Sequence, residues 1–334
     1  MEFEKNVELK KIFNMEIKNN NLTDIISYFK KNKCKSNILK GLNSKNFLSR
    51  GVYGNVFKIH LKDFILAVKL YPFTTNYNLN EFAVYEKISK LFEKHNFNHI
   101  PLLFDLFICK NTNNLNKIIT FLVEKKFLAD QKYYCIIFNE YCKEGTLKRF
   151  MINNNSENDF IKYLLQFFTI MYFLDTNFED FMHNDLHIDN ILVRKGKNKK
   201  YEYNINNLKI VYKCDFELLL NDFGMSTTKK MEKNITSKGF KRDRRYDIFK
   251  FINTFYNRKN KQYKKVDEFI ESLCHQNILK AAITYDNINL VKSFSLQVKI
   301  ETINEIYPFL NIEPVEEILK NKIFKEFVIQ KISF

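Results

Sequence analysis

The segment HNDLHIDNIL concentrates side chains that can hold a metal ion or move a proton. It contains two of the chain's six histidines, His183 and His187, together with Asp185 and Asn190. A second polar stretch, NDFG, follows the apolar run FELLL and contributes Asp222. Carboxylate and amide oxygens are the hard donors that Mg²⁺ prefers. The sequence therefore predicts an Mg²⁺ site formed by the oxygens of Asp185, Asn190 and Asp222.

A zinc site is the alternative that the histidines suggest. The HxxxH spacing of His183 and His187 falls on a loop-like segment, and no third histidine or cysteine lies near it in the sequence. Zinc sites in proteins use three or four protein ligands, and none of the six cysteines here forms a CxxC pair. The sequence therefore disfavours a histidine-based metal site.

Two further stretches have residues suited to a phosphorylated ligand. In LSRGVYGNVFKI, Gly51 and Gly54 lie between apolar segments, which predicts a β-hairpin with a bare backbone turn. The predicted strand FILAVKLY carries Lys69 near its end. Taken alone, an ordinary hairpin and a lysine that reaches solvent are the simpler explanations. Phosphoryl transfer, however, needs metal ligands, a lysine and bare amides at the phosphates, and a carboxylate at the attacking hydroxyl, and all are present.

The hydrophobic pattern predicts the elements that position these residues. NLNEFAVYEKISKLFEKH has apolar residues at helical spacing and carries Glu81 and Glu86. Apolar runs predict a buried strand over 133–138 and a long buried helix over 159–181. The chain is strand-rich to about residue 140 and helix-rich from there to its end, with no Pro/Gly/Ser linker. We expect two parts that pack as lobes of one unit.

Composition indicates a folded protein. The 334 residues include 34 Phe and 18 Tyr, which is too much apolar surface for a disordered chain. The 54 Lys and Arg exceed the 38 Asp and Glu, giving a formal charge of +16 that suits polyanionic partners, although a solvated lysine-rich surface gives the same balance. There is no apolar signal core, and the apolar runs are shorter than the roughly 20 residues of a membrane span. We expect an intracellular, cytoplasmic protein without a membrane partner, whose charge permits but does not require nucleic acid binding.

Taken in order, the motifs resemble those of the protein kinase superfamily from about Leu48 to at least Phe255. They are the Gly-rich loop SRGVYGNV, the strand lysine of AVK, the hinge NEYCKEGTL, the catalytic loop HNDLHIDN and the metal loop DFG, with Gly145 and Gly224 at motif positions. The resemblance implies an α+β, bilobal protein-kinase-like fold with a small antiparallel β-sheet N-lobe and a mainly helical C-lobe. The domains it implies are a helical extension over 1–45, an N-lobe over 46–142 and a C-lobe over 143–334.

The resemblance also implies roles in the catalytic loop. Asp185 is the catalytic aspartate that accepts or orients the substrate hydroxyl, and Asn190 and Asp222 hold Mg²⁺, or Mn²⁺ in its place. His183 is a scaffold residue rather than a proton shuttle. His187 stands two residues after Asp185, where most protein kinases have a lysine near the transferred phosphate. A neutral imidazole there donates one hydrogen bond with less charge stabilisation, and His187 is counted with the catalytic residues.

ATP binding is implied for residues of the first part of the chain. Lys69 holds the α- and β-phosphates and pairs with a helix glutamate. Glu81 is favoured because apolar residues follow it at +3 and +4, and Glu86 is the alternative. The ATP-binding residues implied by the motifs are Ser49, Gly51, Gly54, Val56, Lys69, Glu81, Glu140 and Cys142.

The chain departs from the family pattern at several positions. Asn184 stands where most protein kinases have an arginine that receives an activation-loop phosphate, so we expect activity without such phosphorylation. Ser49 replaces the first glycine of the loop. The segment between Asn190 and Asp222 is longer than in common kinases and is typical of a hairpin or loop, and no APE sequence follows DFG. Asp247 in RRYDIFKF either braces the catalytic loop or is a simple N-cap.

Four features together are similar to haspin and to the late serine/threonine kinases of large DNA viruses such as poxviruses and iridoviruses. They are the HxDLHxxN loop, the long segment before Asp222, the missing APE sequence and the YDxFxF pattern. The Asn/Lys/Ile/Phe-rich composition favours the viral group. The resemblance implies an ATP- and Mg²⁺-dependent serine/threonine protein kinase in the host cytoplasm or the virion. The basic segment from Lys229 to Arg245 suggests acidic or phosphorylated protein substrates. A small-molecule kinase of the aminoglycoside or choline type, and a basic pseudokinase or nucleic-acid-binding scaffold, are the alternatives.

Overall fold

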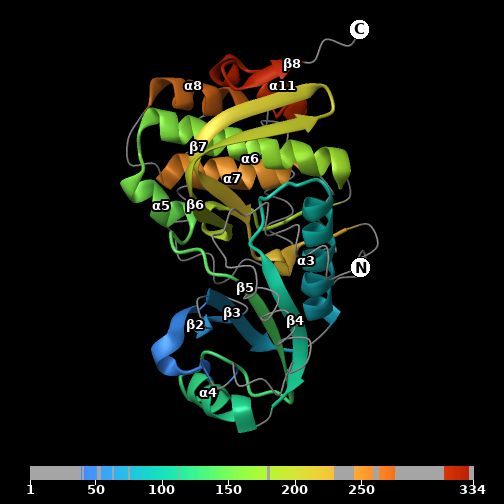
Figure 1. Cartoon of the computed structure of the whole chain (residues 1–334), viewed down its shortest axis with the longest axis vertical. Helices are drawn as coiled ribbons and strands as arrows, with labels where there is room; N and C mark the ends of the chain where they lie inside the picture. The colour runs from blue at the N-terminus through green and yellow to red at the C-terminus, as the bar shows by residue number, and fades with distance from the viewer. Residues whose placement is uncertain are drawn as a thin grey trace. The chain divides into compact units, whose positions relative to one another are not determined.

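In the computed structural model, the chain folds as two compact units, Met1–Cys142 and Lys143–Phe334 (Figure 1). The predicted extension over 1–45 lies almost entirely outside the described residues. The residues that the structure describes are 39, 41–50, 54–61, 64–73, 76–111, 113–178, 181–228, 244–258, 263–274 and 312–330.

The first unit is built on a five-stranded antiparallel sheet with the strand order β1-β2-β3-β5-β4. The strands predicted from the apolar runs are present, and so is the helix predicted around Glu81. The elements of this unit are η3 (Ser44–Asn46), β1 (Phe47–Arg50), β2 (Asn55–Leu61), β3 (Phe64–Pro72), α3 (Asn76–Lys94), β4 (Leu103–Lys110), α4 (Asn113–Glu124) and β5 (Tyr133–Glu140).

The two faces of this sheet are covered by different helices. One face carries Phe57, Val68 and Ile136 and is packed against the apolar side of α4. On the other face, Tyr71 packs edge-to-face against Phe82 of α3, with ring centres 6.5 Å apart. Because side chains alternate along a strand, neighbouring positions of β3 belong to these two environments in turn. The antiparallel N-lobe sheet expected from the sequence is thereby confirmed.

Gly54 immediately precedes β2, where the chain passes very close to β3. A Cβ atom at this position would lie 2.9 Å from the Tyr71 Cβ and 3.1 Å from the Leu70 carbonyl oxygen. Neither atom can move aside as the end of a flexible side chain would. Close approach of the two strands therefore accounts for the glycine.

The second unit is organised around the buried helix α6 (Glu157–Asn177). Ser156 begins the helix with a capping box, since its hydroxyl accepts from the Asp159 N–H and the Asp159 carboxylate accepts from the Ser156 N–H. The helix ends four residues before the predicted end at Phe181, because Phe178 leaves the helical backbone with φ −148°. The other helices are α5 (Leu147–Asn153), η4 (Ile188–Asn190), η5 (Phe223–Met225), α7 (Arg245–Arg258), α8 (Lys264–Leu273), α11 (Val315–Leu319) and η10 (Lys322–Phe324).

The long segment between the catalytic and metal loops is a hairpin rather than a loop. Its strands β6 (Ile191–Ile205) and β7 (Leu208–Leu220) join β8 (Val328–Gln330) in a three-stranded sheet within the mainly helical unit (Figure 1). Gln166 of α6 holds this hairpin: its Nε2 donates to the Phe216 carbonyl at 3.2 Å, and its Oε1 accepts from the Leu218 N–H at 2.9 Å. β8 was not predicted.

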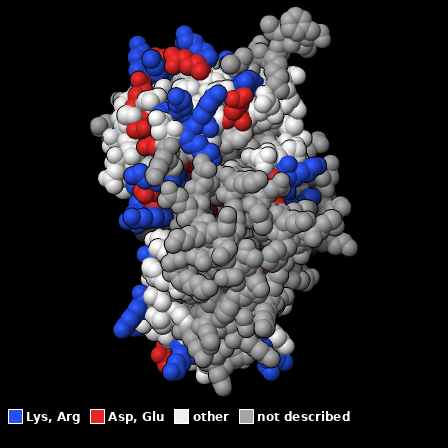
Figure 2. All heavy atoms as spheres, viewed as in Figure 1, with Lys and Arg blue, Asp and Glu red and all other residues white. Residues whose placement is uncertain are grey.

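Charged side chains of both signs are mixed on the visible surface of the second unit. Around α8 and α11, at the top of Figure 2, Lys and Arg lie next to Asp and Glu. Lys320 makes ion pairs with Glu316 at 3.0 Å and Glu317 at 2.7 Å. Within the described ranges, no helix has the length and apolarity that a membrane span requires.

Replacing Gly54 with alanine should lower the free energy of unfolding by about 1–3 kcal/mol, because the added methyl group overpacks the contact with β3. Gly41→Ala is the matched control, since a Cβ there meets Ile59 at an ordinary 3.6 Å. Urea unfolding of both variants measures the difference. Equal stabilities would show that the close approach at Gly54 does not require glycine.

Candidate active site

In the first unit, an ion pair between β3 and α3 fixes Lys69. Its Nζ lies 2.7 Å from Glu81 Oε1, and the Glu81 side chain is only 3% exposed. Glu86, the alternative partner, instead pairs with Lys90 at 2.6 Å on the exposed side of α3. The helical repeat therefore turns Glu81 toward the sheet and Glu86 toward solvent.

The Lys69–Glu81 ion pair lies in apolar surroundings. Tyr71 follows Lys69 by two residues, so both side chains are on one face of β3, and the Lys69 Nζ is 5.3 Å from the centre of the Tyr71 ring. Burial, and then the charge of Glu81, raises the pKa of Tyr71 far above its usual value. The same two causes raise the pKa of Cys135 to about 12. Both neighbours are therefore neutral at physiological pH.

The side chains next to Lys69 on this face of the sheet are half-buried. Val56 is the cross-strand partner of Lys69, and Ala67 is the partner of Asn139. All of these side chains are partly accessible. The Asn139 Oδ1 is buried and receives no hydrogen bond from the described residues. The small and branched apolar side chains of this face suit the apolar faces of a heterocyclic base.

Glu140, a predicted ATP-binding residue, turns its side chain away from that surface. It pairs in register with Leu66, whose side chain lies on the face opposite Lys69. Its Oε2 accepts from the Leu102 N–H at 3.2 Å, and its own N–H donates to the Leu102 carbonyl at 2.9 Å. Glu140 thus holds β5 against the chain entering β4.

The remaining predicted ATP-binding residues lie along the first strands and after β5. Ser49 is exposed on β1, and Gly54 is buried immediately before β2. Cys142, at the end of the first unit, is buried. Gly51 lies outside the described residues.

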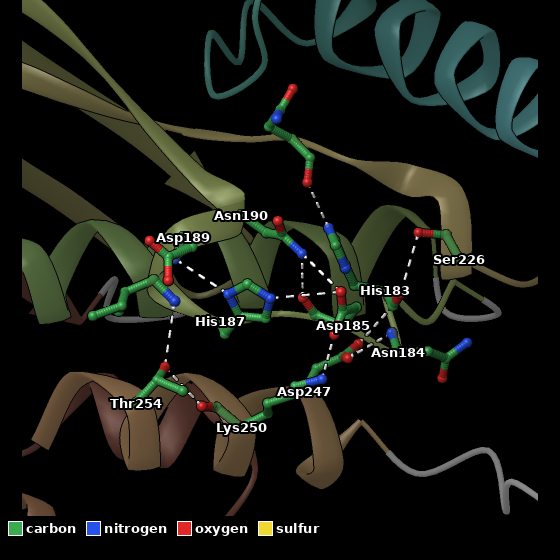
Figure 3. A network of polar contacts seen from close by, with 12 residues as sticks. His183, Asn184, Asp185, His187, Asp189, Asn190, Ser226, Asp247, Lys250 and Thr254 are labelled. Atoms are coloured by element: carbon green, nitrogen blue, oxygen red, sulfur yellow. Dashed lines mark hydrogen bonds and ion pairs between the residues drawn. The ribbon is translucent and has the colours of Figure 1, made fainter. Parts of the chain in front are cut away.

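In the second unit, Asp247 of α7 holds the start of the catalytic loop (Figure 3). Its Oδ2 accepts from the His183 N–H at 2.7 Å and its Oδ1 from the Asn184 N–H at 2.8 Å. Asp247 is 1% exposed. Burial raises its pKa, against the lowering effect of His183 and of the two N–H groups. Because its partners are more than 60 residues away in the sequence, Asp247 is a brace of the loop and not an N-cap.

The side chains of His183 and Asn184 bind the segment around the metal loop. His183 Nε2 lies 3.0 Å from the Asn221 carbonyl, and because a carbonyl only accepts, this nitrogen carries the proton. Asn184 donates to the Met225 carbonyl and to the Thr227 hydroxyl, both at 3.0 Å. Its φ of 62° lies in the left-handed region, which asparagine tolerates better than most residues.

Three side chains converge on the carboxylate of Asp185 (Figure 3). Asn190 Nδ2 donates to Oδ2 at 3.0 Å and to the Asp185 backbone carbonyl at 2.8 Å. Lys250, reaching from α7, contacts Oδ1, and His187 Nε2 lies 3.5 Å from Oδ2. Burial would raise the pKa of Asp185, but the hydrogen bond from His187 and the charge of Lys250 outweigh it and hold the pKa below its usual range. Asp185 is therefore ionised and fixed in orientation.

His187 presents one donor to this carboxylate. Its Nδ1 accepts from the Asp189 N–H at 3.2 Å, so in the neutral ring the proton is on Nε2, which faces Asp185. The Asp189 carboxylate is in turn bound by Lys148 of α5 at 2.9 Å. The ring is thus oriented by its own loop.

Asn190 and Asp222 meet at the base of the β6–β7 hairpin. The Asn221 N–H donates to the Asn190 carbonyl at 3.0 Å, which places Asp222 directly beside this strand end. Asp222 has φ 61° and ψ 74°, a left-handed conformation that costs of order 1–3 kcal/mol. Because the amide nitrogen of Asn190 faces Asp185, its oxygen points the opposite way (Figure 3).

These oxygens fit Mg²⁺ better than zinc. An amide oxygen and a carboxylate are typical protein ligands of Mg²⁺, which completes its six-coordinate shell with phosphate oxygens and water. Within the part of the chain that the structure describes, no group of three or more His, Cys, Asp and Glu is arranged to hold a metal ion. Asn190 and Asp222 have the donor types that an Mg²⁺ ion takes.

Two polar residues were not predicted, Lys250 beside Asp185 in the second unit and Asn139 in the first. Lys250 lies three residues after Asp247, a spacing that puts both on one face of a helix and could have indicated it. Asn139 directly precedes Glu140 in the hinge motif. Its place beside Lys69 depends on the cross-strand register, which the sequence does not reveal.

Residues 42–246 match the family model described as protein tyrosine and serine/threonine kinase. The match covers more than half of the chain and includes the Lys69–Glu81 ion pair, the catalytic loop and the metal loop. Among curated proteins, none matches this chain.

Asp247→Ala should lower the free energy of unfolding by about 2–6 kcal/mol, because each of two buried N–H groups left without an acceptor costs about 1–3 kcal/mol. Glu268→Ala is the control, since that side chain is 56% exposed and its loss should change stability by less than about 0.5 kcal/mol. Urea unfolding measures both. A change as small as that of the control would mean that the loop does not depend on Asp247.

Stability should fall in alkaline solution partly because of Cys135. The pKa of this buried thiol is raised from 9.0 to about 12, so above about pH 9 the unfolded chain releases a proton that the folded chain keeps. This costs about 1.4 kcal/mol per pH unit until the pH reaches the folded-state pKa. Urea unfolding at pH 9 and pH 10 should give a smaller decrease for Cys135→Ala than for the wild type. Equal decreases would show that the thiol ionises freely in the folded state.

Proposed function

The chain belongs to the protein tyrosine and serine/threonine kinase family, and on this premise we propose that it is an ATP- and Mg²⁺-dependent kinase that phosphorylates serine and threonine in proteins. The observation that carries the proposal is the support of Asp185. Asp247 holds the backbone beside it, while Asn190 and Lys250 bind its side chain. A carboxylate that is kept ionised and fixed in this way suits one task, the orientation of an attacking hydroxyl.

In the proposed reaction, the hydroxyl oxygen of the substrate forms a bond to the γ-phosphorus of ATP. The bond between that phosphorus and the β,γ-bridging oxygen breaks, and ADP leaves. Asp185 accepts the hydrogen bond of the hydroxyl and takes its proton as the transfer proceeds. Asn190 holds Asp185 both at its carboxylate oxygen Oδ2 and at its backbone carbonyl. Asp185 therefore needs little reorganisation during the transfer.

The remaining residues bind ATP. Lys69 neutralises the α- and β-phosphates, and Glu81 keeps its side chain in place at 2.7 Å. Val56 and Ala67 offer apolar surface to the base. Mg²⁺, or Mn²⁺ in its place, neutralises the phosphate charge when it is bound by Asn190 and Asp222.

We further propose that activity does not require phosphorylation of the activation loop. Asn184 carries no charge to pair with a phosphate. Its amide already donates to the Met225 carbonyl and the Thr227 hydroxyl. The contact between the catalytic loop and the segment after the metal loop is therefore made without a modification.

The preference for serine and threonine rests on the resemblance to haspin and to the late kinases of large DNA viruses. The sequence features that carry this resemblance are the HxDLHxxN loop, the long segment before Asp222, the missing APE sequence and the YDxFxF pattern. Action in the host cytoplasm or virion is proposed on the same ground. The basic segment that suggests acidic or phosphorylated substrates lies mostly outside the described residues.

The test is transfer of labelled γ-phosphate from ATP with Mg²⁺ to casein, myelin basic protein and the protein itself. We expect label on serine and threonine. The rate of transfer should fall by at least about 10²-fold in Asp185→Asn, which removes the base, and in Lys69→Met, which removes a phosphate-binding charge. Lys90→Met is the control, since Lys90 pairs with Glu86 on the exposed side of α3.

Other outcomes of this assay separate the alternatives. Label on tyrosine would contradict the proposed specificity while leaving a protein kinase. Transfer to choline or an aminoglycoside but to no protein would indicate a small-molecule kinase. ATP binding without any transfer, in every acceptor tried, would indicate a pseudokinase or scaffold.

A further inference from the structure

The catalytic loop lacks a lysine, but a lysine reaches it from elsewhere in the fold. His187 occupies the position two residues after Asp185, and its ring offers one hydrogen donor at 3.5 Å. The ammonium group of Lys250, in contrast, is in direct contact with Asp185 Oδ1. It comes from α7, 65 residues away in the sequence.

The face of α7 that carries Lys250 is built against the catalytic loop. Asp247, one turn before, holds the loop backbone, and Thr254, one turn after, accepts from the Ile188 N–H at 3.3 Å. Lys250 therefore lies between two fixed contacts on a rigid helix, as Figure 3 shows. Its position relative to Asp185 is set by backbone contacts rather than by a mobile side chain alone.

The surroundings keep Lys250 charged and partly accessible. Its side chain is 24% exposed. Its ammonium lies 6.0 Å from the centre of the Tyr246 ring. Burial lowers the pKa of Lys250, but Tyr246 and Asp185 raise it by more, so the net shift is upward. A lysine ammonium has three donors, so one can stay on Asp185 while another turns toward a second oxygen.

We propose that Lys250 supplies, from helix α7, the positive charge that acts beside Asp185 during phosphoryl transfer and that the catalytic loop does not provide at residue 187. This inference rests on the proposed kinase function. As the hydroxyl oxygen bonds to the γ-phosphorus and its proton passes to Asp185, negative charge develops on the phosphoryl oxygens. Lys250 neutralises that charge, and it holds Asp185 in position before the transfer.

A structural ion pair would behave differently from this role. If Lys250 served folding alone, its loss would lower stability and leave the catalytic constants of the folded protein unchanged. If it acts on the transferred phosphoryl group, its loss lowers kcat with little effect on the KM for ATP. A lysine introduced at residue 187 would then restore the missing charge from the other side of Asp185.

The experiment compares full-length wild type, Lys250→Met, Lys250→Arg and the double variant Lys250→Met with His187→Lys. Steady-state transfer to casein gives kcat and KM, and urea unfolding shows that each variant is folded. We expect Lys250→Met to lower kcat by about 10²-fold or more, with the KM for ATP changed by less than about threefold. Lys250→Arg should retain part of the activity, and the double variant should recover at least tenfold over Lys250→Met. Lys264→Met, with a side chain 88% exposed on α8, is the control.

The outcomes separate this inference from the proposed function. If the wild type is active and the kcat of Lys250→Met lies within threefold of it, the role of Lys250 is overturned. The proposed kinase function would still stand. Failure of the double variant to recover activity, when it is folded, would show that the charge is not the property that matters. A wild type that transfers no phosphate to any acceptor would overturn the proposed function and this inference together.

Discussion

The second unit depends on one buried carboxylate. Asp247 accepts the backbone N–H groups of His183 and Asn184, and these two bonds fix where the catalytic loop leaves the protein core. The positions of the side chains that follow in the loop depend on these two bonds. His183 then reaches Asn221, Asn184 reaches the chain after the metal loop, and Asp185 is left facing outward. Burying a charged group costs free energy, and here the two backbone donors and the adjacent helix offset that cost.

The first unit solves a related problem with less hydrogen bonding. Lys69 and Glu81 are opposite charges enclosed by Tyr71, Cys135 and α3. Because the neighbours are neutral, the mutual attraction of the pair is weakly screened. Removing one partner would leave the other buried without its counter-charge, which is more costly than losing an exposed ion pair such as that of Glu86 and Lys90. Lys69 is thus held by an ion pair in apolar surroundings, whereas Asp185 is held by several hydrogen-bond donors.

The local surroundings of a candidate residue could be predicted where a short motif adjoins a regular element. Asn190 and Asp222 lie next to apolar runs that form β6 and β7, so their neighbourhood was predictable. The apolar spacing after Glu81 indicated which face of α3 it occupies. Prediction failed where tertiary contacts decide. The contact of Lys250 with Asp185 joins segments 65 residues apart. The inward turn of Glu140 depends on strand register, and β8 is three residues long. Only packing selects such short or distant partners.

The β6–β7 hairpin also bears on how this part of the chain can change in evolution. It begins immediately after Asn190 and ends immediately before Asn221, and its first pair is Ile191 with Leu220. As long as that pair is kept, the separation of the catalytic and metal loops is independent of the length of the strands. Residues can be added or removed in pairs at the Asn206–Asn207 turn, one on each strand, without moving either loop. The tip has constraints of its own, because Leu208–Ile210 pair with β8 and Asn206 Nδ2 donates to the Thr176 hydroxyl at 3.2 Å. Packing within the second unit therefore limits the tip, while the base is limited by the positions of the catalytic and metal loops.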